Sequence, residues 1–288
     1  MPVASEKVLT PIEPVHIQEK TIQATLSRIR HKLFVMSGKG GVGKSSVTVN
    51  IAAALAERGF RVGILDVDIH GPSVPNLLGL RLPLQAHGNP PLIRPARFSD
   101  RLSVVSMDSL LTNKDTAIIW RGPKKAAAIR RFFFDVDWGE LDFLLIDSPP
   151  GTGDEHMAVL KTIPDVQCIL VTTPQEISLA DVRKAIDFLH TTHASILGLV
   201  ENMSGLACPA CGADIPLFKK GGGKKLAETA KLRFLCAIPI DPATVVAADQ
   251  GTPVVLLKEA SPAKDAFTEL AQHVSQAVQE ARQPGIQR

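Results

Sequence analysis

The sequence predicts an α/β fold with one doubly wound, mostly parallel sheet and helices on both of its faces. Three observations lead to this prediction. Short apolar runs such as RVGILD at 61–66 and FLLID at 143–147 are typical of strands that are buried on both faces. Segments with helical periodicity follow these runs along most of the chain. No internal repeat or linker divides the sequence, so the alternation predicts parallel strands joined by helical crossovers.

Composition argues against several classes of protein. Of the 288 residues, 45% are hydrophobic and the net charge is only +3, which favours a buried core and gives little support to nucleic-acid binding. Four cysteines are too few for a secreted disulfide framework. No apolar run reaches the roughly 18 residues of a membrane span, and the first residues lack the apolar core of a signal peptide. We therefore expect a cytoplasmic protein with neither a nucleic acid nor a membrane as its partner.

The chain is expected to begin with an N-terminal appendage over residues 1–31. Three prolines interrupt the first half of this polar stretch, and only residues 18–30 have the pattern of a short helix. Residues 32–288 are then expected to form a single domain, which the next motif identifies as an ATPase domain.

The strongest motif is a glycine-rich loop between a predicted strand at 32–36 and a predicted helix at 46–58. It matches G-x-x-x-x-G-K-[ST], the phosphate-binding loop (P-loop), in which backbone N–H groups and the helix dipole surround an anion. Lys44 supplies a charge for the β- and γ-phosphates, and Ser45 is placed to ligate Mg²⁺. ATP and Mg²⁺ are therefore the predicted ligands, and the predicted binding residues are Gly38, Lys39, Gly40, Gly41, Val42, Gly43, Lys44, Ser45 and Ser46.

Two predicted strands end in carboxylates, at the sheet edge where open α/β sheets bind nucleotides. The first strand ends in DVD, and we favour Asp68 as the catalytic carboxylate, whereas Asp66 fits a strand-end cap equally well. The second strand ends at Asp147, the arrangement in which an aspartate holds a Mg²⁺-bound water or the P-loop serine. The prolines and glycines that follow, Gly151 among them, form a turn suited to sensing whether the γ-phosphate is present.

The remaining elements continue the alternation. Residues 81–101 predict a loop or short hairpin, and Pro123 suits the first turn of a helix whose basic residues form a polar face. Cys168 and Cys236 fall within strands, which predicts inert core positions. The other predicted strands are 102–106, 166–172, 196–203 and 234–238, and the other predicted helices are 178–190 and 263–281.

A second chemical motif, CPACG, lies in a loop near residues 204–221. Its Cys208 and Cys211 have the spacing of a metal knuckle and of a redox pair. The residues that follow start a helix poorly, which disfavours a thioredoxin-like pair, whereas a structural or disulfide role stays open. Zinc or an iron–sulfur cluster commonly takes four thiolates, and a symmetric dimer would supply this pair twice. The motif therefore favours a metal site shared between two copies of the chain.

Lys39, directly after the first P-loop glycine, is a cation that the motif itself does not require. The pattern K-G-G-V-G-K-S resembles the deviant P-loop ATPases, the group of MinD, ParA and the nitrogenase iron protein. That resemblance implies that Lys39 reaches across a nucleotide-sandwich dimer to the partner's phosphates. A surface lysine that faces solvent is the alternative.

More specifically, the chain resembles the Mrp (ApbC-like) family of deviant P-loop ATPases from about residue 32 to residue 257. The motifs that carry the resemblance are GKGGVGKS, DVDIHGPSVPNLLG, IIWRGP, DVDWGELDFLLIDSPPGTGDEH, ENMSGLACPACG and IPIDPATVVAADQGTPVV. The resemblance implies a homodimeric ATPase that assembles or transfers a [4Fe–4S] cluster to apo iron–sulfur proteins. In such a dimer, Cys208 and Cys211 of both protomers would bridge the cluster.

The same resemblance implies roles at the nucleotide site. Asp68 would help to position the attacking water, and Asp147 would belong to the Mg²⁺ shell. Asn202 would contact adenine, helped by the segment from Pro239 to Asp241.

Two other functions would use a similar nucleotide site. A ParA- or MinD-like positioning ATPase would act on DNA or membrane, which the CPACG loop and the absence of a basic membrane helix disfavour. An electron-transferring reductase similar to the nitrogenase iron protein would also hold a cluster in an ATP-bound dimer. The ligand cysteines of that family are widely separated, whereas the two cysteines here are close together in one loop.

Overall fold

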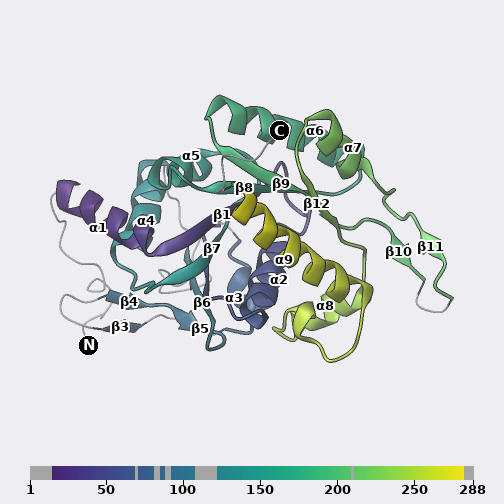
Figure 1. The fold of residues 1–288 in the computed structure, drawn as a ribbon, viewed down its shortest axis with the longest axis horizontal. Helices are drawn as coiled ribbons and strands as arrows, with labels where there is room; N and C mark the ends of the chain where they lie inside the picture. Colours follow the sequence, from purple (N-terminus) through teal and green to yellow (C-terminus); the bar gives the residue numbers. More distant parts are fainter. Residues whose placement is uncertain are drawn as a thin grey trace, which may run out of the picture.

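A sheet of eight strands runs through the centre of the computed structural model, which describes residues 15–68, 71–80, 85–87, 92–107, 122–208 and 211–281. The strands lie in the order β12-β9-β8-β1-β7-β2-β6-β5 (Figure 1). All neighbouring pairs are parallel except β5 with β6, which is antiparallel. Because β1 lies near the middle of this order, the loop that follows it opens at the centre of the sheet edge.

The strands of this sheet are β1 (Ile29–Ser37), β2 (Val62–Asp66), β5 (Ala96–Arg97), β6 (Leu102–Ser106), β7 (Leu141–Asp147), β8 (Gln167–Thr172), β9 (Ser195–Glu201) and β12 (Phe234–Ala237). Two short antiparallel hairpins lie outside it, β3 (Gln85–His87) with β4 (Leu92–Arg94) and β10 (Leu206–Ala207) with β11 (Asp214–Ile215). The helices are α1 (Val15–Ser27), α2 (Lys44–Glu57), α3 (Val74–Leu77), α4 (Gly122–Phe134), α5 (Asp154–Thr162), α6 (Glu176–Thr191), α7 (Gly222–Thr229), α8 (Pro242–Asp249) and α9 (Pro262–Ala281), with a 3₁₀ turn at Val254–Leu256.

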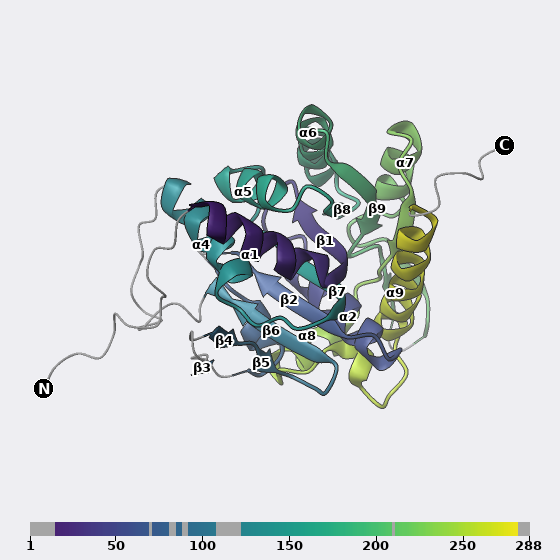
Figure 2. The same cartoon turned by 60° about the vertical axis from the view of Figure 1, so that its left-hand side comes forward.

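Helices cover both faces of the sheet (Figure 2). One hydrophobic core lies under α2, α3, α8 and α9, and a second lies under α1, α4, α5, α6 and α7. Each central strand contributes apolar side chains to both cores, and all five residues of β2 are buried. This is why the sequence of these strands is apolar without alternation. The predicted doubly wound, mostly parallel α/β fold is confirmed.

The long C-terminal helix α9 docks as its apolar stripe predicts. Phe267, Leu270, Val274 and Val278 are buried, and α9 lies against α2 and β12. Thr268, Gln272, Gln276 and Gln279 on the opposite side are exposed, so the helix covers the sheet with one face only.

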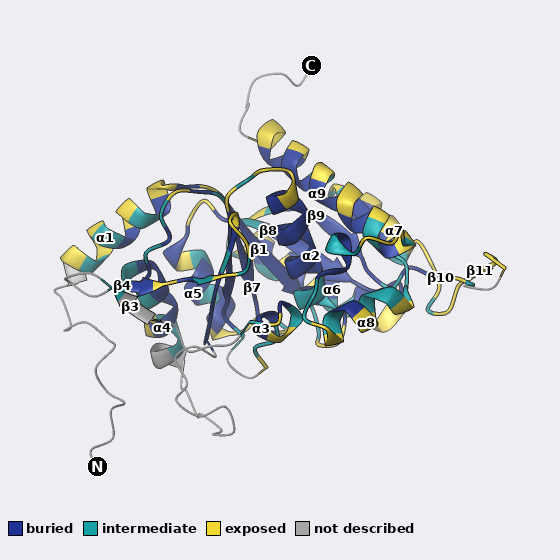
Figure 3. Ribbon diagram, turned by 90° about the horizontal axis from the view of Figure 1, so that it is seen from below, coloured by how far each residue is buried: buried dark blue, intermediate teal, exposed yellow. Residues whose placement is uncertain are grey.

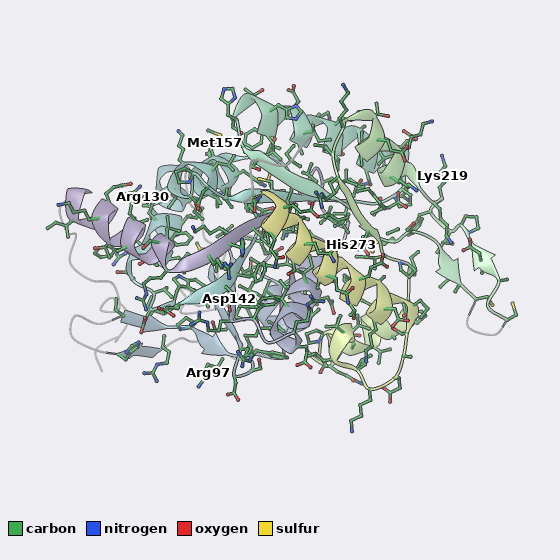
Figure 4. All side chains as sticks on the ribbon, in the orientation of Figure 1. Arg97, Arg130, Asp142, Met157, Lys219 and His273 are labelled. Carbon is green, nitrogen blue, oxygen red and sulfur yellow. The ribbon has the colours of Figure 1, made fainter. Side chains whose placement is uncertain are left out.

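The predicted boundary between residues 31 and 32 falls inside β1, which begins at Ile29. Helix α1 is also part of the body, because Ile22 and Leu26 are buried in the second core. On its outer side, Glu19 pairs with Arg130 of α4 at 2.6 Å between Oε2 and Nη2 (Figure 4). Residues 15–31 of the predicted appendage therefore pack as an integral layer, whereas residues 1–14 lie outside the described part of the chain.

Four helices had no counterpart in the sequence analysis, namely α3, α5, α7 and α8. Each has nine residues or fewer, too few to produce a clear helical period. Among the residues that the structure describes, no helix has both the length and the apolar character needed to cross a bilayer.

Candidate functional site

The P-loop connects the end of β1 to the start of α2, where three strands present their carboxyl ends together. Val35 of β1 lies beside Asp147 of β7, and Asp147 lies beside Asp66 of β2. The loop therefore opens next to both carboxylate-terminated strands, as the sequence predicts for a nucleotide site.

The glycines of this loop are required for two different reasons. Gly41 and Gly43 have φ values of 80° and 81°, in the left-handed region that favours glycine. Gly38 is needed instead for close approach, since a Cβ there would lie 2.3 Å from the backbone carbonyl carbon of Asp181 in α6. The second reason depends on the packing of α6, so the loop sequence alone could not reveal it.

Asp147 is the centre of the polar contacts below the loop and is fully buried. Lys44 Nζ lies 2.9 Å from its Oδ1, and the Ser45 hydroxyl donates to its Oδ2 at 2.6 Å. The Thr48 hydroxyl also donates to Oδ1 at 2.7 Å. Thr48 was not among the predicted site residues, although it follows Lys44 by one helical turn and so faces the same side.

The oxygen atoms at this point suit Mg²⁺, which prefers hard oxygen ligands. Ser45 Oγ and the Asp147 carboxylate are within hydrogen-bonding distance of each other, at the start of α2 and beside the loop. These residues fit the predicted metal, with Ser45 as a ligand and Asp147 behind it.

Asp66 and Asp68 are only two residues apart but differ in environment. Asp66 is fully buried and accepts hydrogen bonds from the Asp68 N–H and the Ser106 hydroxyl. Its burial, together with the adjacent Asp147, raises the pKa of Asp66 well above 3.8 and favours the neutral acid. Asp68 is only partly buried, and its Oδ1 accepts from the Gly71 N–H at 3.2 Å. Asp66 therefore has the contacts of a strand-end cap, and Asp68 is the more accessible carboxylate.

The segment after β7 is bonded to the strand that carries the P-loop. Gly151, with a φ of 90°, donates its N–H to the Ser37 carbonyl at 3.1 Å. The helix that follows is anchored by Glu155, whose Oε1 lies 2.6 Å from Lys125 Nζ of α4. Burial raises the pKa of Glu155, but hydrogen bonds and the Lys125 charge outweigh this effect and lower the pKa overall. Lys125 is thus an internal anchor rather than part of an exposed polar face.

The residues predicted to contact adenine have other contacts in the structure. The Asn202 side chain donates to the Val42 carbonyl in the P-loop at 2.8 Å. The Asp241 carboxylate caps α8 through the Ala243 N–H and also accepts from the Ala263 N–H at the start of α9. Their contact with adenine, and that of Pro239, stays a prediction.

Lys39 and Gly40 lie at the outer rim of the loop. Lys39 is half-buried, and its carbonyl accepts a hydrogen bond from the Ser37 hydroxyl at 2.9 Å. Gly40 is exposed. The reach of the Lys39 side chain into a partner's site stays a prediction.

Cys208 and Cys211 lie at the end of the β10–β11 hairpin, which projects from the body (Figure 1). The Cys208 N–H donates to the Ala213 carbonyl, and the Gly212 N–H donates to the Cys208 carbonyl, both at 2.8 Å. Gly212 has a φ of 73°, so the chain doubles back there as predicted. Cys211 is exposed, and no disulfide joins the cysteines that the structure describes.

The other two cysteines are core residues, as predicted. Cys168 and Cys236 are buried, and burial raises the pKa of both thiols to about 12. Within the described ranges, no three or more histidine, cysteine, aspartate or glutamate side chains gather as a metal site. The described part of one chain therefore carries two thiols on the projecting hairpin, Cys211 exposed and Cys208 partly buried, and no complete set of metal ligands around them.

Comparison with known proteins gives the family of the chain. The chain matches the family of NUBPL iron-transfer P-loop NTPases, in the ParA group, over residues 28–275. An iron-sulfur cluster carrier protein of Methanocaldococcus jannaschii is 48% identical over 241 residues, 83% of each chain. The cytosolic Fe-S cluster assembly factor NUBP2 of Homo sapiens is 44% identical over 261 residues, which are 88% of this chain and 94% of NUBP2.

Solved structures show the same fold. A nucleotide-binding protein of Archaeoglobus fulgidus, in complex with ADP and with cobalt found by PIXE, has a TM-score of 0.71 and 36% identity, covering 85% of this chain and 98% of its own. The cell division ATPase MinD of Pyrococcus furiosus has a TM-score of 0.61 at 24% identity, covering 85% of this chain and 98% of its own, and shows the fold alone. The predicted resemblance to iron–sulfur carriers among the P-loop ATPases is confirmed, and the chain belongs to the family of NUBPL iron-transfer P-loop NTPases.

Proposed function

We propose that this protein is an ATP-hydrolysing carrier that holds a [4Fe–4S] cluster as a homodimer and passes it to apo iron–sulfur proteins. The observation that carries the proposal is the pair Cys208 and Cys211 on a projecting hairpin, while the other two cysteines are buried. Relatives named as iron–sulfur cluster carriers, at 43–48% identity, support it. The name of human NUBP2 supports the cytosol as the compartment.

The P-loop performs the nucleotide chemistry in this proposal. Its N–H groups and the N-terminus of α2 bind the phosphates. Lys44 places its ammonium group against the transferring phosphoryl group and stabilises its negative charge. Mg²⁺, held through Ser45 with Asp147 behind it, supplies further neutralisation of phosphate charge. Asp68 orients the water whose oxygen attacks the γ-phosphorus as the bond to the bridging oxygen breaks. Lys39 of each protomer stabilises the phosphates bound by its partner, so hydrolysis requires the dimer.

The cluster is the cargo, and its ligands determine the assembly. A [4Fe–4S] cluster commonly takes four thiolates, and each chain offers only the two on its projecting hairpin. A twofold axis beside the two hairpins brings together two copies of Cys208 and Cys211, because a symmetric interface repeats every group. Slow hydrolysis at the P-loop is then coupled to loading or release of the cluster.

Reconstitution without oxygen tests this proposal. The purified protein is incubated with iron and sulfide, and its metal content, sulfide content, absorption spectrum and sedimentation are measured. We expect about four irons and four sulfides per dimer, and a shift from monomer to dimer, because a ligand held only by the dimer stabilises it.

The cysteine variants complete the test. Cys208→Ala and Cys211→Ala should each lose the cluster, whereas Cys168→Ala and Cys236→Ala should keep it. ATP binding should survive in all four variants, because the P-loop is a separate element. A cluster-loaded monomer, or a stable cluster in the Cys208→Ala, Cys211→Ala double variant, would show that the proposal is wrong.

A further inference from the structure

The segment that carries the two thiols joins the body at a narrow base. We define the CxxC arm as the described residues 204–208 and 211–221, which leave the body after β9 and return to it before α7. Figure 3 shows the arm as a largely exposed projection beside a buried sheet. Two backbone hydrogen bonds fix its first residues, from the Ser204 N–H to the Ile238 carbonyl and from the Ile240 N–H to the Gly205 carbonyl.

One buried carboxylate holds both ends of this arm. Glu201, the last residue of β9, is fully buried, and its Oε1 accepts from the Ser204 hydroxyl at 2.5 Å and from the Gly221 N–H at 2.8 Å. Its Oε2 accepts from the Gly223 N–H in the first turn of α7 at 2.5 Å. A Cβ at Gly223 would lie 3.0 Å from Glu201 Oε2, so glycine permits this approach. Hydrogen bonds to a buried carboxylate are strong, and they set the position of the arm on the sheet.

The next residue holds the P-loop. The Asn202 side chain donates to the Val42 carbonyl at 2.8 Å, and the Asn202 N–H donates to the Thr172 carbonyl of β8 at 2.8 Å. Asn202 also lies against Gly43, where an added Cβ would be 2.2 Å from its Nδ2. Any shift of the loop at Val42 or Gly43 therefore acts on Asn202 directly.

The chain between Asn202, which contacts the P-loop, and Ser204, which contacts Glu201, has little freedom to absorb such a shift. Met203 has a φ of 59°, a left-handed conformation that is uncommon for a residue with a side chain. Two residues later, the Gly205 N–H donates to the Met203 carbonyl at 3.1 Å. The turn out of β9 is thus fixed on both sides, by Glu201 and by this hydrogen bond.

We propose that Glu201 is a positioning residue that, together with Asn202, links the P-loop to the CxxC arm, so that a nucleotide bound at the P-loop changes the position of the two thiols. The use of this link in cluster transfer rests on the proposed function. The link itself couples the P-loop to the CxxC arm through Glu201 and Asn202, which are adjacent at the end of β9. Coupling of this kind is reciprocal, so occupation of the thiols changes the affinity for nucleotide by the same factor.

Amide hydrogen exchange measures this coupling without any cluster. The wild-type protein is compared with and without Mg²⁺ and a slowly hydrolysed ATP analogue. We expect the nucleotide to change the exchange rates of the Cys208, Gly212 and Gly221 amides by about threefold or more. In Glu201→Gln the side-chain NH₂ faces at least one backbone donor, so the Gly221 or Gly223 amide should exchange about tenfold faster. The effect of nucleotide on the arm should then disappear, while the affinity for the analogue stays within about threefold.

Two further variants separate the link from general destabilisation. Asp214→Asn is the matched control, because it removes an exposed ion pair with Lys220 inside the arm and leaves the base untouched. It should retain the full nucleotide effect. Asn202→Ala cuts the other end of the link, so at an analogue concentration that saturates the variant's own nucleotide site it should abolish the nucleotide effect on the arm without accelerating exchange at Gly223. This variant also decides the question if Glu201→Gln does not fold.

The outcomes are distinct for the link and for the proposed function. If wild-type arm amides do not respond to the analogue, or if Glu201→Gln and Asn202→Ala still respond, the link does not exist. If the arm responds as expected but wild-type protein binds no iron and sulfide on reconstitution, the proposed function is wrong and the link stands.

Discussion

The P-loop and the CxxC arm are both glycine-containing segments that follow strands of one sheet, yet the protein surrounds them to very different extents. The P-loop lies against the backbone of α6, the side chain of Asn202 and the buried Asp147. The arm consists of two short strands held mainly at its base, with Ile215 and Leu217 exposed by 39% and 55%. One chain therefore builds most of a phosphate site but supplies only two of the four thiolates that the proposed cluster needs.

This difference has a physical cause. A phosphate site needs fixed N–H groups and a cation, all of which a strand–loop–helix unit supplies from adjacent residues. A cluster that must be loaded and handed on needs access, and access is lost where side chains are packed on every side. The exposed arm has few buried contacts to oppose its opening, so we expect its local stability to be low.

The largest expected difference between the two regions is in thiol reactivity. At pH 8, Cys208 and Cys211 should react with a chromogenic disulfide reagent, whereas Cys168 and Cys236 should not react until the protein unfolds. A rise in pKa from 9.0 to about 12 lowers the thiolate fraction of the buried pair about a thousandfold. Counting two thiols before denaturation and four after it checks this expectation, and a third reactive thiol in folded protein contradicts it.

The same raised pKa values predict how stability depends on pH. Between pH 9 and pH 12 the two thiols ionise in the unfolded chain but remain protonated in the core. The free energy of unfolding should therefore fall as pH rises through this window. Denaturant titrations at several pH values should show that the free energy of unfolding depends less on pH in Cys168→Ala than in wild type.

Removal of Lys44 should have the next largest effect. Lys44→Ala should lower the rate of ATP hydrolysis on the order of 100- to 1,000-fold, because the transferring phosphate loses its cation. Lys32→Ala is a matched control, since each lysine is 7% exposed and paired with an aspartate, but Lys32 pairs with Asp165 instead. Normal turnover in Lys44→Ala would remove this residue from the site.

A mixing experiment tests whether the nucleotide site is completed by a partner. Lys39→Ala and Asp68→Ala should each bind ATP but hydrolyse it poorly. Mixed in equal amounts, random pairing places one intact site in half of the dimers, so about a quarter of wild-type activity should return. If activity does not return at any ratio, Lys39 does not act across the dimer.

The smallest expected effect compares one glycine from each region. Gly38→Ala forces a Cβ to within 2.3 Å of α6 and should lower the free energy of unfolding by about 1–3 kcal/mol. Gly212→Ala has no atom within 4 Å of the added Cβ, so its cost is only the left-handed backbone, about 1–2 kcal/mol. That cost falls on the arm, which can open locally, so the global unfolding midpoint should move less than in Gly38→Ala. Equal midpoint shifts in urea would mean that the arm and the P-loop belong to one cooperative unit.

Several features could be predicted from short stretches of sequence because their physics is local. The P-loop, the strand ends at Asp66 and Asp147, and the turn at Gly212 each depend on residues a few positions apart. The two buried cysteines were recognisable from their apolar neighbours. The same local reasoning failed for residues 15–31, because they pack against α4. That helix lies more than a hundred residues further along the chain.

What the sequence determined by itself was the set of parts: a phosphate-binding loop, two acidic strand ends, a CxxC turn and an α/β alternation. Only the tertiary structure decided how these parts meet. The strand order brings Asn202 to Val42 across 160 residues, and it places Glu201 between the two ends of the arm. Contacts of this kind arise from which strands pair in the sheet, a choice that local propensity and spacing do not encode.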